Sequence, residues 1–301
     1  MGIASAAPVI GCGLCASLRA GDGQGPAVPV HEAHDRLAAA RRRVDTLDLG
    51  DLAGLPTPAY PAPELLGDPD DVRGGVLAQA YAVMGRPANG RLPEKVARGI
   101  EAGAGIIAAS VAGLYVPPWV GGGGRIVINT PTIAKLMARE AVADRDALAS
   151  LVIAHERVHH VQHTLQTWQD VFLQVVDEVL AADRRTRREV AARAQAIMSV
   201  VEGHASFVER LAVMALHGDD DDVWWRVRGR HLDQRLGGLL QGLISVLFAS
   251  KRDQYKRGML FSADASDLVP DAFRIMFGEL DGMPRPDELD HAERWRSRLL
   301  L

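Results

Sequence analysis

The clearest hydrophobic pattern along the chain is helical and lies between residues 146 and 165. Apolar residues recur there at steps of three and four, which places them on one face of an α-helix: Leu151, Ala154, Val158, Val161 and Leu165. Similar spacing predicts helices over residues 72–84 and 93–113, and over Arg187–Leu216, where Gly218 ends the helix. The chain after Pro131 is therefore expected to be chiefly helical.

A short β pattern precedes the helix at 146–165. Leu114–Val116 and Arg125–Asn129 are rich in β-branched and aromatic residues, and they flank a turn-rich stretch at 117–124. We expect a β-hairpin, either purely structural or able to pair with an extended substrate by backbone hydrogen bonds. The predicted fold class is mainly α (α+β), a zincin-like helical domain with a small β-hairpin before the central helix.

Three regions are expected along the chain. Residues 1–30 are rich in Gly, Ala and Pro without periodicity, which predicts a disordered tail. Residues 31–71 are expected to form an N-terminal helix over His31–Leu49 and then a linker, because prolines stand at positions 56, 58, 61, 63 and 69. Residues 72–301 are expected to form the main domain.

Composition and charge exclude some classes of partner. With 301 residues, 48% of them hydrophobic, the chain can build a substantial core. A formal net charge of −4 and the lack of a basic stripe argue against nucleic acid or an anionic membrane as a partner. The longest apolar run, Leu236–Ala249, is shorter than the ~20 residues that cross a bilayer. We expect a cytoplasmic protein.

The central helix carries the most informative motif, the HExxH sequence from His155 to His159. Four residues advance a helix by about 400°, so the two imidazoles project about 40° apart, one turn above the other, and can share one metal ion. Glu156 lies beside them, where it can accept a proton from a water on the metal. The motif predicts bound Zn²⁺ and a catalytic base.

A catalytic zinc usually has a third protein ligand and one open position. Metzincins would place Gly at position 162 and His at 165, but this chain has Gln162 and Leu165, which excludes that class. His163 is one turn beyond His159 on the same straight helix and cannot readily curl back to the same ion. We expect an imidazole that supports the metal ligands without binding the ion, or one at the surface.

Two glutamates remain as candidates for the third ligand. Glu178 follows His159 by nineteen positions, a spacing that resembles some zinc aminopeptidases. Glu202 precedes Gly203 within the predicted helix Arg187–Leu216. A glycine inside a helix costs about 1 kcal/mol relative to alanine, so Gly203 indicates close approach to another helix, and packing against the HExxH helix would supply the reason. We favour Glu202 and keep Glu178 as the alternative.

Several stretches resemble a family of zincin-like metallohydrolases found chiefly in actinobacteria and often labelled as associated with biosynthesis of the deazaflavin coenzyme. The similar segments are Val152–Gln162, Met198–Val208 with its Glu-Gly-His-Ala sequence, Lys251–Gly258, Pro131–Ile133, Met283–Pro284, Glu288 and Trp295. The resemblance implies a zinc site of His155, His159 and Glu202 with Glu156 as base. The chain departs from the family pattern at Ser206, where an acidic residue is common, and at His163, where an aromatic residue is common.

These residues predict a zinc-dependent hydrolase, a metallopeptidase that cleaves a peptide or another amide substrate. By analogy with other zincins, Tyr255 is the candidate hydrogen-bond donor to the oxyanion, and the alternative for it is a buried aromatic residue with a satisfied hydroxyl. His204 is an alternative donor, although it lies about 200° round the helix from Glu202. A different class also fits, a non-catalytic scaffold stabilised by zinc, in which a partner binds the hairpin or the segment Trp224–Trp225.

Overall fold

The computed structural model describes residues 27–84, 94–121, 124–218, 221–232 and 256–299. Most of the expected disordered tail, and Tyr255, lie outside these described residues. The helices are α1 (Val30–Val44), α2 (Leu49–Leu52), α3 (Pro69–Met84), α4 (Glu94–Ser110), α5 (Thr130–Met137), α6 (Arg145–His163), α7 (Gln166–Ala181), α8 (Arg187–His217), α9 (Asp221–Leu232), α11 (Ala272–Gly278) and α12 (Ala292–Leu299), with a further helix over residues 256–268. The strands are β1 (Glu64–Gly67), β2 (Gly113–Val116) and β3 (Arg125–Asn129), and short 3₁₀ turns lie at Pro118–Val120, Val142–Asp144 and Leu280–Gly282. The mainly helical fold class is confirmed.

The sheet contains the predicted hairpin and one strand that was not predicted. β2 and β3 pair antiparallel, with Gly113 opposite Ile128 and Val116 opposite Arg125, which confirms the hairpin. β1 pairs parallel with the other side of β3, so the strand order is β1-β3-β2. β1 lies between prolines in the expected linker, where four residues are too few to show a period-two pattern.

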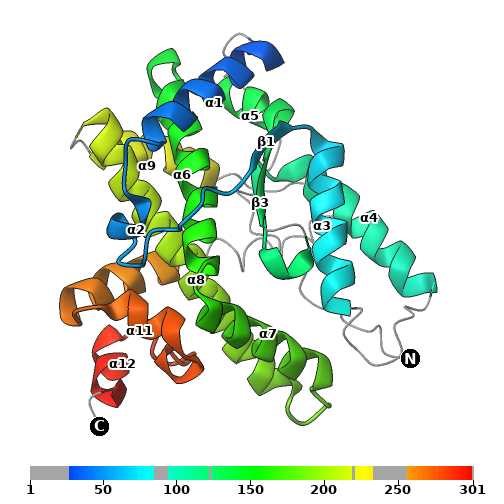
Figure 1. Cartoon of the computed structure of the whole chain (residues 1–301), viewed down its shortest axis with the longest axis vertical. Coiled ribbons are helices and arrows are strands. Elements are labelled where there is room, and N and C mark those ends of the chain that lie inside the picture. Colours follow the sequence, from blue (N-terminus) through cyan, green and yellow to red (C-terminus); the bar gives the residue numbers. More distant parts are fainter. Residues whose placement is uncertain (1–26, 85–93, 122–123, 219–220, 233–255, 300–301) are drawn as a thin grey trace.

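The two faces of the sheet pack against different helices (Figure 1). Side chains alternate along a strand, so Tyr115, Ile126 and Ile128 belong to the main core with α6. Leu114, Val116 and Val127 point to the other face and form a smaller core with α3 and α4. The sheet therefore separates the α3–α4 pair from the helix that carries HExxH.

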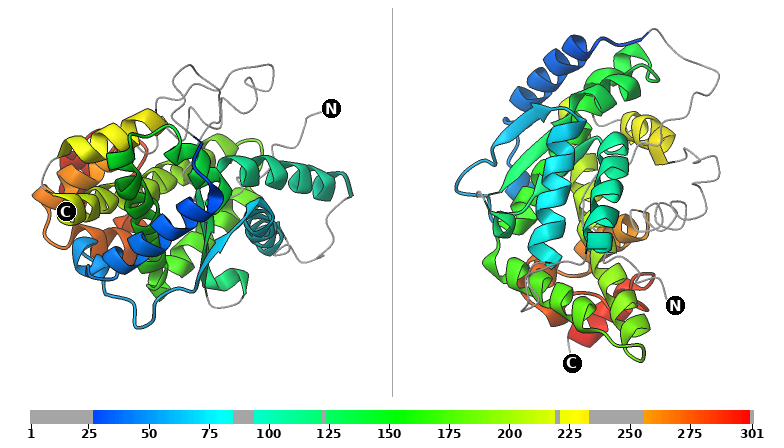
Figure 2. Two further views of the ribbon diagram at one scale, coloured as in Figure 1. Left: turned by 90° about the horizontal axis from the view of Figure 1, so that it is seen from above. Right: turned by 90° about the vertical axis from the view of Figure 1, so that its right-hand side faces the viewer.

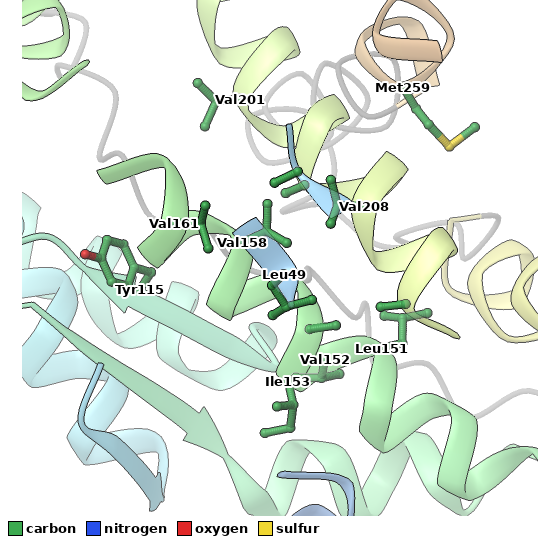
Figure 3. Close-up of a cluster of buried hydrophobic side chains, with 14 of the residues drawn as sticks. Leu49, Tyr115, Leu151, Val152, Ile153, Val158, Val161, Val201, Val208 and Met259 are labelled. Carbon is green, nitrogen blue, oxygen red and sulfur yellow. The ribbon is translucent and has the colours of Figure 1, made fainter. Parts of the chain in front are cut away.

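Helix α6 is the central element, and its side chains are buried along nearly its whole length. Figure 3 shows Val158 and Val161 of α6 in one cluster with Val201 and Val208 of α8. In Figures 1 and 2 the C-terminal helices α11 and α12 and the α3–α4 pair lie on opposite sides of α6 and α8. No described helix is both long enough and apolar enough to span a bilayer.

Charged side chains attach the N-terminal segment to α6. Arg157, inside the HExxH motif, donates to Glu64 of β1 and forms an ion pair with Asp45 at 2.7 Å. Arg41 of α1 contacts the other oxygen of Glu64 at 2.7 Å. Because both oxygens of Glu64 are engaged, β1 and α1 are fixed against the helix that carries the motif.

Gly203 allows a close approach, but to a different helix from the one expected. A Cβ added at Gly203 would lie 2.0 Å from the carbonyl carbon of Gly258, and a Cβ at Gly258 would lie 1.7 Å from the carbonyl oxygen of Ser199. The close partner is therefore the helix over residues 256–268. The expectation that the HExxH helix explains Gly203 is wrong, since the backbone contact needs a glycine on both sides.

Gly203→Ala is expected to lower the free energy of unfolding by about 3 kcal/mol, because the added methyl group would overlap backbone that cannot move aside cheaply. Urea unfolding followed by circular dichroism measures the change. Gly99→Ala is the matched control, because nothing lies within 4 Å of a Cβ there and alanine favours helix by about 1 kcal/mol. Equal stability of the two variants would contradict the close approach.

Candidate metal centre

The HExxH residues lie on the buried side of α6, as the helical spacing predicts. His155 and Glu156 are 0% exposed and His159 is 1% exposed. The Nε2 atoms of His155 and His159 are 3.2 Å apart, with their rings 79° from coplanar. Two imidazole nitrogens that face each other this closely need a proton or a cation between them.

Helix α8 brings Glu202 to the same point. Its Oε2 lies 3.5 Å from Nε2 of His155 and 4.0 Å from Nε2 of His159. Two ligands at 2.0–2.1 Å from a tetrahedral zinc stand about 3.4 Å apart. The three atoms therefore fit one shared ion, and the donor set of two imidazoles and one carboxylate is a catalytic zinc set.

The alternative ligands are placed elsewhere. Glu178 lies on α7, where it pairs with Arg193 at 3.0 Å and accepts a hydrogen bond from Gln174. His163 is buried among aromatic rings. Among the residues that the structure describes, the group able to hold a metal comprises His155, His159 and Glu202 alone.

The electrostatics of the two histidines differ. Burial opposes protonation of His155, but the carboxylates of Glu209 and Glu202 outweigh burial and raise its pKa to about 9. Burial, together with the neighbouring charge on His155, lowers the pKa of His159 to about 3. The group thus attracts one positive charge, which a proton on His155 supplies when no metal is bound.

Glu209 orients His155 and was missed in the sequence. Its Oε2 accepts a hydrogen bond from Nδ1 of His155 at 2.6 Å, which leaves the lone pair of Nε2 facing the metal position. Its Oε1 accepts from Trp224 Nε1 at 3.1 Å and lies 3.3 Å from Nε of Arg228. Glu209 follows Glu202 by seven positions, two turns on the same helix face, and this spacing is the signal that could have revealed it.

Glu209→Gln is expected to weaken zinc binding by about 10- to 100-fold, because an amide holds the His155 ring less firmly than a carboxylate does. Competition with a chromophoric chelator measures the affinity. Glu189→Gln is the control, since Glu189 is exposed in the first turn of the same helix. Zinc affinity equal to that of the wild type would show that Glu209 does not position His155.

A chain of hydrogen bonds orients His159. The carbonyl oxygen of Ala53 can only accept, so Nε2 of His204, 3.0 Å away, carries the proton, and its Nδ1 accepts from Gln162 at 2.9 Å. Burial lowers the pKa of His204 to about 4, which keeps this ring neutral. The oxygen of Gln162 then accepts from Nδ1 of His159 at 2.8 Å. Nε2 of His159 is left with a lone pair toward the metal position.

Glu156, the expected base, lies against the start of β2. A Cβ added at Gly113 would lie 2.6 Å from its Oε1 and 2.9 Å from its Cδ. Gly113 therefore provides the space that the carboxylate occupies. Because this strand and α6 meet only through the tertiary fold, no local pattern connects Gly113 with Glu156.

The structure describes two of the expected substrate contacts, His204 and strand β2, and its geometry favours neither of them. Tyr255 lies outside the described residues. His204 has both nitrogens engaged in hydrogen bonds, which argues against it as the oxyanion donor. On β2, Gln79 of α3 donates to the carbonyl of Tyr115 at 2.9 Å, and all of Gly113–Val116 is buried. The burial of β2 and the bonded carbonyl of Tyr115 favour the purely structural alternative for the hairpin.

Comparison with known proteins supports the fold. No protein-family model matches the chain, and no curated protein matches its sequence. A solved structure from Chloroflexus aurantiacus, described as "a putative hydrolase with a novel fold", is similar with a TM-score of 0.64 and 18% identity, over 90% of this chain and 92% of that chain. The similarity in fold extends over nearly the whole chain. In this chain the fold contains a buried group of His155, His159 and Glu202 that could hold a metal.

Proposed function

We propose that this protein is a zinc-dependent hydrolase that cleaves an amide bond, most simply a peptide bond. The observation that carries the proposal is the meeting of three ligand atoms, from His155, His159 and Glu202, within 4.0 Å of one another. Glu156 lies close enough for its charge to act on His155. The similarity in fold to a protein described as a putative hydrolase supports the same class.

The roles of the residues follow from their chemistry. His155, His159 and Glu202 would hold the zinc ion, which would supply a water with a lowered pKa and polarise a carbonyl oxygen. Glu156 accepts the proton of the water as its oxygen forms a bond to the carbonyl carbon, and it returns the proton to the leaving nitrogen as the C–N bond breaks. Glu209 and Gln162 hold the two imidazoles in the tautomers that this requires.

The scaffold alternative is less well supported. Structural zinc sites are closed by four protein ligands, and among the described residues no fourth His, Cys, Asp or Glu joins the group. A scaffold would also have no use for the carboxylate of Glu156. Trp224 is buried and donates to Glu209, so it supports the site from within, whereas Trp225 is 47% exposed.

The test of the proposal is a cleavage assay with a mixture of fluorogenic peptides. The zinc-loaded protein is expected to hydrolyse some of them, to stop when a chelator removes the metal, and to recover when zinc is restored. Product termini identified by mass spectrometry distinguish amide hydrolysis from other chemistry. A zinc-loaded protein that cleaves no peptide or simpler amide would contradict the proposal.

A further inference from the structure

A small cavity lies against the metal centre. Its volume is about 20 Å³, and its lining residues are Tyr115, Pro117, His159, His163, Phe172, Met198 and Val201. A space of this size admits about one water molecule or one oxygen atom and excludes a side chain. Its walls are apolar apart from two histidines and the hydroxyl of Tyr115, which lies 3.3 Å from Nδ1 of His160.

Among the described residues, His163 is the polar group of this wall that keeps a nitrogen without a hydrogen bond. Its Nδ1 is buried and has no hydrogen-bond partner among the residues that the structure describes. The ring is held by Tyr115, Phe172 and Trp168, with centroid distances of 5.3, 5.8 and 6.0 Å. Burial and the neighbouring His159 lower the pKa of His163 to about 3, so the ring is neutral and carries one N–H group.

We propose that this cavity receives the carbonyl oxygen of the bond to be hydrolysed and that His163 donates a hydrogen bond to that oxygen. The inference rests on the proposed function. As the water oxygen bonds to the carbonyl carbon, the π electron pair moves onto the carbonyl oxygen, which becomes negatively charged. A donor already fixed in an apolar wall stabilises this charge without reorganisation, so His163 acts as a catalytic residue.

Reserving a buried nitrogen for the substrate lowers the stability of the free protein, because the nitrogen loses its water without gaining a partner. A phenyl ring removes that nitrogen, and the adjacent cavity offers room for its extra atom. If a bond inside the protein used this nitrogen, its replacement would remove that bond and give the opposite result. The stability of the metal-free protein therefore tests whether the nitrogen is unpaired, without any measurement of activity, and kcat tests whether the substrate uses it.

The experiment compares His163→Phe with His204→Phe, a histidine whose two nitrogens are both bonded. In the metal-free full-length chain, we expect His163→Phe to raise the melting temperature by about 2–4 °C and His204→Phe to lower it. In the zinc-loaded protein, His163→Phe is expected to keep one zinc per chain and to lower kcat on the fluorogenic peptides by about 10²- to 10³-fold.

The outcomes separate this inference from the proposed function. A melting temperature of His163→Phe that does not rise would show that the ring is structural and would overturn the inference. A raised melting temperature with unchanged kcat would place the carbonyl oxygen elsewhere and overturn it as well. Wild-type protein that is inactive with zinc would overturn the proposed function and the inference together.

Discussion

Replacing Glu156 by Gln is expected to leave one zinc per chain and to lower kcat by roughly a thousandfold or more. The amide has the shape of the carboxylate and fits the space that the missing side chain of Gly113 leaves, but it cannot accept the proton of the attacking water. Zinc content by atomic emission and cleavage of the fluorogenic peptides measure the two effects. The separation of metal binding from turnover is the result that identifies Glu156 as a base.

Glu156→Asp is the matched variant, because it keeps the carboxylate and draws it back toward α6. We expect it to retain more activity than Glu156→Gln, since a base is still present at a longer distance. Circular dichroism checks that both variants fold like the wild type. Undiminished turnover of Glu156→Gln at full zinc occupancy would remove Glu156 from the mechanism and require a different base.

Glu202→Ala is expected to weaken zinc binding by roughly a thousandfold and to abolish turnover at micromolar zinc. Removing one of three ligands costs more than removing a residue that only orients a ligand, which typically costs about 10- to 100-fold. Competition with a chromophoric chelator measures the affinity. Glu202→Gln repeats the test with a side chain of the same shape, so a packing defect cannot account for the loss.

Glu178→Ala is the matched control, because the sequence offered Glu178 as the other third ligand. Its carboxylate lies on α7 and pairs with Arg193, so zinc affinity is expected to stay at the wild-type value. Full zinc occupancy in Glu202→Ala together with a loss in Glu178→Ala would reverse the assignment. The pair therefore decides the ligand set whether or not a substrate is known.

The sequence predicted the elements whose evidence is local. The HExxH motif and the apolar positions around it lie within a few turns of one helix. Strands β2 and β3 of the hairpin are separated by only a short connection. Backbone geometry alone relates residues that close together, because side chains repeat every 3.6 positions in a helix and every two in a strand. β1 escaped prediction because its four residues pair with β3, about sixty positions away.

Glu202 was chosen from the sequence for an incomplete reason. Gly203 pointed to a close helix contact near Glu202, but the contact is with Gly258 and not with the HExxH helix. Glu202 nevertheless faces His155, because α8 also packs along α6. A glycine inside a helix indicates that another segment of the backbone comes close, but it does not identify that segment.

The sequence by itself determined that a helix would present two imidazoles and a carboxylate, and that a hairpin would precede that helix. Only the tertiary structure decided that Glu202 completes the group and that Glu209 holds His155. It also decided that the series of hydrogen bonds from Gln162 through His204 ends at the carbonyl of Ala53, 151 residues before His204. These contacts depend on how separate helices cross. Crossing is set by the packing of many side chains together, which no short stretch of sequence contains.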